Sequence, residues 1–162
     1  MKKSICIILI FLLVIGLIPS SSADTSEDNT PTGVASENLY FSDNFFITEY
    51  GSRASSFSLS PSLSVSSPSA NKVTATANAF TNVIVDKIGF TSLRIQRWDG
   101  SKWINAVSWT NKYKTNTLSF SFTGSTSSAT SGAYYRAVCT FYAEKNGETE
   151  SVTVTTSYIK CK

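Results

Sequence analysis

The chain has 162 residues, of which 41% are hydrophobic and 15% charged, and its formal net charge is +3. This length suits one domain with a single modest core. The sequence contains no histidine, which excludes Ser-His-Asp and Cys-His catalytic sites and histidine-ligated metal sites. We expect no catalytic centre, no metal site and no cofactor.

The first 23 residues have the three parts of a secretory signal peptide. Lys2 and Lys3 supply positive charge, residues 5–18 are an apolar run, and Ser21-Ser22-Ala23 offers small residues for cleavage. The apolar run is shorter than the ~20 residues that span a bilayer. We therefore expect a secreted, extracellular protein with no membrane span in its mature chain.

Residues 24–53 form an acidic leader. They carry six acids against Arg53 alone, whereas the chain from Ala54 onward carries eleven bases against five acids. A segment rich in acids, Ser, Thr and Asn cannot bury enough apolar surface to offset its chain entropy. We expect a mostly disordered leader and a folded domain at residues 54–162. An apolar cluster between Leu39 and Tyr50 leaves open a second interpretation, in which the leader docks on the basic domain.

The domain shows the alternation of apolar and polar residues that is typical of strands. Turn residues interrupt this alternation about every ten positions, as in a β-sandwich or barrel. Seven strands are predicted, at 56–65 with a break at Pro61, 72–80, 87–98, 103–110, 115–122, 134–144 and 148–158. Seven strands without a helix predict an all-β, antiparallel β-sandwich.

Two connections define the register of their hairpins. Asp99-Gly100-Ser101-Lys102 joins two predicted strands, and Asn146-Gly147 is a two-residue turn because both positions tolerate positive φ. With the second turn fixed, Cys139 faces Val154 across the last hairpin.

Three segments of the domain carry a family resemblance. They are the string Leu93–Trp103, the loop Ser125–Gly132 and the strand start Tyr134–Cys139. Together they resemble small secreted bacterial proteins with an immunoglobulin-like or fibronectin-III-like domain, over about Ser56–Tyr158. The resemblance implies an immunoglobulin-like β-sandwich and a secreted location. The family has no agreed activity or catalytic residues to transfer.

Enzyme activity is not expected. A glycosidase needs two carboxylates facing each other across a cleft. The domain supplies only five acids, most of them at turns: Asp86, Asp99, Glu144, Glu148 and Glu150. A Ser-Lys dyad is the one hydrolytic arrangement that the sequence leaves open.

Aromatic and polar residues around the hairpin at 87–110 form a candidate ligand-binding strip. If Trp98 pairs with Trp103, Leu93 and Ile95 face the core. The outward strip then consists of Arg94, Gln96, Trp98, Trp103 and Trp109. Such a strip suits a carbohydrate or a cell-surface protein. A bulge in the connecting loop would reverse the parity and turn Trp103, Val107 and Trp109 into core residues. Buried rings would favour the alternative, a structural module of the cell surface with no small ligand.

Two cysteines remain after the signal peptide. Cys139 alternates with core residues, and Cys161 lies between two lysines, seven positions beyond Val154. At ~3.3 Å per residue this offset is too long for a disulfide. We predict no disulfide, a buried Cys139 thiol and an exposed, reactive Cys161 thiol. The diffuse positive charge of the domain predicts no nucleic-acid partner, and we expect a monomer.

Overall fold

The structure, a computed structural model, describes residues 29–162. The predicted signal peptide and the first five leader residues lie outside the described residues. Within the described range, no helix is long and apolar enough to cross a membrane.

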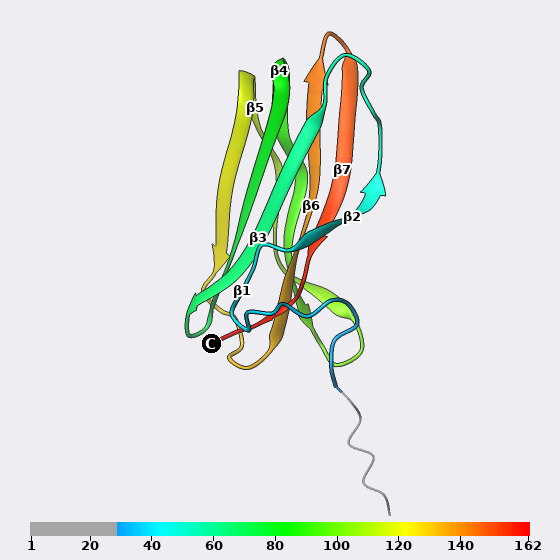
Figure 1. The fold of residues 1–162 in the computed structure, drawn as a ribbon. Coiled ribbons are helices and arrows are strands. Elements are labelled where there is room, and N and C mark those ends of the chain that lie inside the picture. Colours follow the sequence, from blue (N-terminus) through cyan, green and yellow to red (C-terminus); the bar gives the residue numbers. More distant parts are fainter. Residues whose placement is uncertain (1–28) are drawn as a thin grey trace, which may run out of the picture.

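Residues 29–162 form eight antiparallel strands, which confirms the predicted all-β class (Figure 1). They are β1 (Phe41–Ser42), β2 (Phe45–Tyr50), β3 (Leu59–Ser69), β4 (Lys72–Trp98), β5 (Trp103–Thr126), β6 (Tyr134–Lys145), β7 (Glu148–Thr156) and β8 (Ile159–Lys160). Hydrogen bonds connect them in the order β1-β3-β4-β6-β7-β2, with β5 beside β4 and β8 beside β6.

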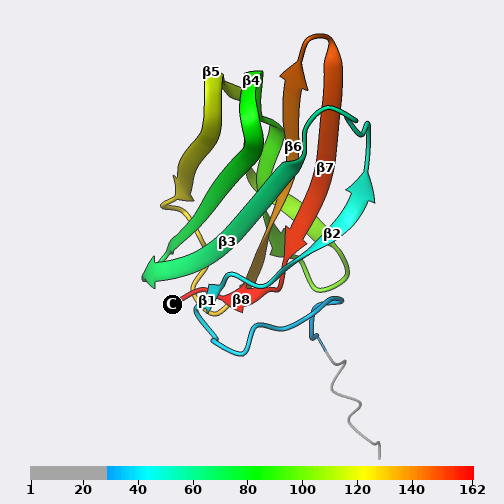
Figure 2. The same cartoon turned by 45° about the horizontal axis from the view of Figure 1, so that its top comes forward.

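The long strand β4 runs through both layers of the sandwich. Phe80 pairs with Ser119 and Val85 with Thr117, so four β4 residues face Leu118 alone. This bulge bends the strand. The first half of β4 pairs with β3, and the second half pairs with β6 (Figures 1 and 2). The predicted strands 72–80 and 87–98 are therefore one strand, as are those at 103–110 and 115–122.

The core lies between the two layers. The first half of β4 contributes a row of small residues, and its second half contributes Leu93 and Ile95; β6 adds Ala137, Cys139 and Phe141. The Phe90 ring contacts those of Phe120 and Phe122 edge-on, with centroids 5.6 and 5.3 Å away. The apolar residues that alternate with polar ones in the sequence are thus the residues that the structure buries.

Both predicted turns are present. Asp99 Oδ1 accepts hydrogen bonds from the Ser101 and Lys102 amides, both at 2.9 Å, and these bonds hold the pKa of Asp99 below its usual value. Asn146 and Gly147 have φ angles of 50° and 81°. Cys139 faces Val154, as the turn predicts.

Part of the leader differs from the expectation of disorder. β2 pairs with β7 from Phe45↔Thr156 to Tyr50↔Val152, and β1 pairs with β3. The apolar residues of this stretch allow strand formation, and the open edge of β7 supplies backbone hydrogen-bond partners. The leader therefore contributes two short strands to the sheet.

Candidate functional site

The structure divides the five residues of the predicted strip between two faces. Arg94, Gln96 and Trp98 alternate with the buried Leu93 and Ile95, and so lie on the outer face of β4. Trp103 lies opposite Trp98, on the same outer face of β5. Trp109 faces inward and packs against the core. Four of the five residues are therefore brought together, and one is not.

A bulge at Ala106 is the reason for this division. Gln96 pairs with Asn105, but the next residue of β4, Ile95, pairs with Val107. Ala106 is the extra residue, so the parity of β5 changes there. The bulge lies within the strand rather than in the turn. It therefore moves Val107 and Trp109 to the core side and leaves Trp103 outside.

Trp109 is a packing residue. Its ring lies 5.8 Å from that of Phe122. It also lies flat against Gly124, where an added Cβ would come within 2.6 Å of the ring. The absence of a side chain at Gly124 makes room for the indole. The predicted ligand-binding role of Trp109 is therefore corrected to core packing.

Aromatic rings gather around Trp103 on the outer face. The ring centroids of Trp98 and Tyr158 lie 5.4 and 6.1 Å from that of Trp103. The guanidinium of Arg136 stands 4.5 Å above the Trp103 ring, in cation–π geometry. Trp98 is only 8% exposed. These rings are packed against one another rather than presented as an open platform.

A leader segment, residues 29–36, covers this aromatic cluster; we call it the strap. Trp103 Nε1 donates a hydrogen bond to Thr32 O at 2.9 Å. Ala35 forms a parallel bridge with Tyr158, whose amide donates to Val34 O at 2.8 Å. Pro31 is buried. Part of the leader thus docks on the domain through residues 29–36, which lie outside the apolar cluster that the second interpretation used for docking.

A line of planar polar groups crosses three strands beside the aromatic cluster. Arg136 Nε donates to Gln96 Oε1 at 2.9 Å, and Gln96 Nε2 donates to Asn105 Oδ1 at 3.1 Å. We call Gln96, Asn105 and Arg136 the outer network. Gln96 is buried, Arg136 is half-buried and Asn105 is exposed. The buried Gln96 therefore holds the more exposed Arg136 and Asn105 side chains in place through these two hydrogen bonds.

The outer network lies in a region of unbalanced positive charge. Burial lowers the pKa of Arg136, and the nearby positive charge of Arg94 lowers it further. Arg94 Nε is buried without a hydrogen-bond partner among the described residues. A ligand that offers hydrogen-bond acceptors would satisfy these donors.

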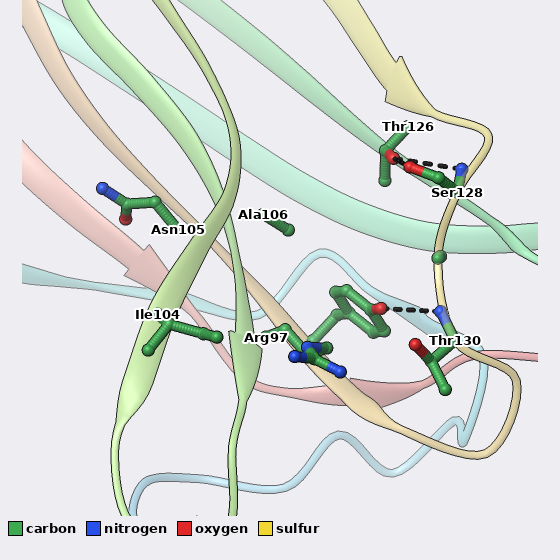
Figure 3. Close-up of a pocket in the computed structure, with 9 residues that line it drawn as sticks. Arg97, Ile104, Asn105, Ala106, Thr126, Ser128 and Thr130 are labelled. Carbon is green, nitrogen blue, oxygen red and sulfur yellow. Dashed lines mark hydrogen bonds between the residues drawn. The ribbon is translucent and has the colours of Figure 1, made fainter.

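A cleft opens at one end of the sandwich (Figure 3). Its volume is about 300 Å³. We call it the end cleft, and it is lined by Arg97, Ile104, Asn105, Ala106, Thr126, Ser128, Ala129, Thr130 and Tyr135. Asn105 belongs to both the outer network and the end cleft. The two features are therefore neighbours on the surface.

The structure corrects the predicted exposure of Cys161. Cys139 and Cys161 are both buried and neither forms a disulfide. The C-terminal segment continues along β6 as β8, where the Cys161 amide donates to Ala133 O at 2.9 Å. These backbone bonds hold the side chain against the core, despite the flanking lysines.

Sequence reasoning missed Arg136, Asn105, Arg97 and the strap. The inward row of Leu93, Ile95 and Arg97 was the one available signal, because it places a charge where the alternation requires an apolar residue. The described residues contain no group of three or more Cys, Asp or Glu side chains that could hold a metal ion.

Comparisons with protein-family models, with curated proteins and with solved structures find no match to this chain. The described residues therefore assign the protein to a fold class, the all-β antiparallel proteins, and to no family.

Proposed function

We propose that the protein is a secreted, non-enzymatic binding module that takes a carbohydrate at its outer sheet face. The outer network, set beside Trp103 and Arg94, is the observation that carries this proposal. Amide and guanidinium groups are planar donors and acceptors that can pair with sugar hydroxyls. The signal-like N-terminus and the resemblance to immunoglobulin-like secreted domains support an extracellular, monomeric module.

The network supports polar recognition more than stacking. Arg136 uses Nε for Gln96, and its terminal N–H groups make no hydrogen bond with another described residue. Asn105 accepts from Gln96 and keeps its own amide N–H groups for a ligand. Arg136 and the strap already occupy the surroundings of the Trp103 ring. We therefore expect hydrogen bonds to dominate ligand binding at this face.

The second candidate is a structural module of the cell surface without a small ligand. The packing of the aromatic cluster favours it, since Trp98 is nearly buried and the strap covers its neighbour Trp103. In this case the aromatic rings and the strap serve stability alone.

A screen of glycans and cell-wall polysaccharides tests the proposal. We expect the protein to bind at least one of them, and Asn105→Ala and Arg136→Gln each to weaken that binding at least about tenfold, the effect of ~1.4 kcal/mol. The matched control is Asn78→Ala, because Asn78 lies on the outward side of the other layer. This control should bind like the unmodified protein.

Two results would overturn the proposal. The first is that the unmodified protein binds none of the glycans. The second is that Asn105→Ala and Arg136→Gln both bind a glycan as tightly as the unmodified protein does. The first result leaves the structural module as the better account, and the second places the glycan site away from the outer network.

A further inference from the structure

The last inward-facing residue of β4 is charged. Leu93 and Ile95 are buried in the core, and Arg97 is the next residue on that side. Arg97 pairs with Ile104 of β5 and with Tyr135 of β6. All three residues line the end cleft. The floor of the cleft is therefore a continuation of the core with a guanidinium in it.

The guanidinium of Arg97 has no partner in the described part of the chain. The side chain is half-buried, yet it makes no hydrogen bond or ion pair with any of residues 29–162. Among residues 29–162, no Asp or Glu lines the cleft. A buried cation is normally paired with an anion, whereas the nitrogens of the half-buried Arg97 are open to solvent in the cleft. The cleft thus presents a positive charge without an internal counterion.

Tyr135 offers a second unused donor. Its side chain is 1% exposed, and its hydroxyl oxygen accepts a hydrogen bond from the Thr130 amide at 2.8 Å. The hydroxyl hydrogen has no acceptor among the described residues. Figure 3 shows Arg97 between Ile104 and Thr130, on the side of the cleft where this bond lies. Both donors therefore lie within one cavity.

The opposite wall is built from hydroxyl groups. Thr126 Oγ1 and Ser128 Oγ lie 3.2 Å apart, and the Ser128 amide donates to Thr126 Oγ1 at 3.3 Å. The Ala129 amide bonds to Asn71 O at 3.0 Å and fixes this loop to the neighbouring turn. A ligand would meet hydroxyls on this wall and the guanidinium on the other.

We propose that the end cleft binds a carboxylate group, with Arg97 as its cationic partner and the Tyr135 hydroxyl as an added donor. The guanidinium can pair with both oxygens of a carboxylate. One cation balances a singly charged carboxylate, whereas a phosphate monoester carries about −1.5 to −2 charges at pH 7. The hydroxyl wall and the cleft volume of about 300 Å³ suit one acidic sugar unit, such as a uronic acid. This site is distinct from the proposed carbohydrate site, although Asn105 borders both.

Titration of the full protein with sodium glucuronate tests the inference. Glucose is the neutral control, sodium acetate separates an acidic sugar from a free carboxylate, and sodium chloride keeps the ionic strength constant. We expect saturable binding of glucuronate, no binding of glucose and weaker binding of acetate. Acetate that binds as well as glucuronate would support the carboxylate site and identify small acids as its ligands.

Variants locate the binding. Arg97→Gln should weaken glucuronate binding at least tenfold. Arg97→Lys should retain part of the affinity, because lysine keeps the positive charge but lacks the planar guanidinium that donates two hydrogen bonds to one carboxylate. Arg53→Gln is the matched control, since Arg53 is exposed beside the Tyr50 ring and does not line the cleft, and it should bind glucuronate normally. If Arg97→Gln does not fold, Tyr135→Phe keeps the ring and removes the hydroxyl donor, and it should weaken binding severalfold.

The outcomes separate the two proposals. Glucuronate binding in a protein that binds no neutral glycan would support the end cleft and leave the outer face without its ligand. Absence of saturable binding of both glucuronate and acetate overturns the carboxylate site. Full binding by a folded Arg97→Gln variant, or by Tyr135→Phe where Arg97→Gln does not fold, overturns it as well.

Discussion

Single residues set the reactivity of the two cysteines. Burial raises the pKa of the Cys139 thiol, and the nearby Arg94 lowers it by less. The Cys161 sulfur lies 3.7 Å from Ser67 Oγ, and this side chain is also buried. A thiol that is buried and protonated is a poor nucleophile.

We expect both thiols to resist alkylation in the folded protein at neutral pH. Peptide mapping by mass spectrometry after a short iodoacetamide pulse measures the labelling of each cysteine separately. Denaturation before the pulse is the control, and it should expose both. Rapid labelling of Cys161 in the folded state would contradict its packing against β6 and β3.

Gly124 is required by the ring of Trp109. Gly124→Ala would place a methyl group 2.6 Å from that ring, and overpacking of this kind costs about 1–3 kcal/mol of unfolding free energy. Denaturant unfolding measures the loss. The double variant Gly124→Ala with Trp109→Leu should lose less than the sum of the two single losses. Additive losses would show that the two side chains do not share this space.

At the scale of elements, the bulge at Ala106 decides which face each residue of β5 occupies. Deletion of Ala106 removes only the extra residue, so Val107 stays opposite Ile95 and Trp109 stays on the core side. We therefore expect this deletion to cost little unfolding free energy. Deletion of Ser121, which lies in a regularly paired stretch of β5, should move a neighbouring phenylalanine ring out of the core and cost about 3–5 kcal/mol. Thermal and denaturant unfolding measure both losses. An Ala106 deletion that is as costly as the Ser121 deletion would contradict the bulge.

The elements differ in how far their sequences predict them. Asn146-Gly147 and Asp99-Gly100 define their hairpins because only a few residues accept the backbone angles of tight turns. The alternating rows define the buried faces. The bend of β4 at residues 81–84 and the bulge at Ala106 have no Gly or Pro to mark them, so they depend on packing between the layers. The outward placement on the sheet was therefore predicted correctly for four residues of the candidate strip and incorrectly for Trp109.

At the scale of the whole molecule, the strap ties the leader to the sandwich. Thr32 and Val34 accept hydrogen bonds from Trp103 and Tyr158, which lie more than 60 positions away in the chain. Nothing in the local sequence of the leader specifies such a partner. The docking depends on the surface that the folded domain provides.

Replacement of residues 30–34 by a Gly/Ser segment of equal length tests the strap. The change removes the buried Pro31 ring and gives the unfolded segment more conformational freedom to lose, while the backbone carbonyl of residue 32 remains as the acceptor of the Trp103 indole. We expect it to cost about 1–3 kcal/mol of unfolding free energy. The melting temperature should then fall by several degrees. The control is Val34→Ser, because Val34 is 58% exposed. An unchanged melting temperature in the Gly/Ser variant would show that the strap adds no stability.

The central claim is that the outer network receives a carbohydrate, and NMR mapping of the bound state tests it most directly. The ¹⁵N-labelled protein is titrated with the tightest-binding glycan of the screen, and the side-chain signals of Gln96, Asn105 and Arg136 are followed. We predict saturable shifts of these signals, with little change at the core amides of Leu63 and Val73 in the other layer. Shifts at another surface, with the three network signals unmoved at saturation, would contradict the account.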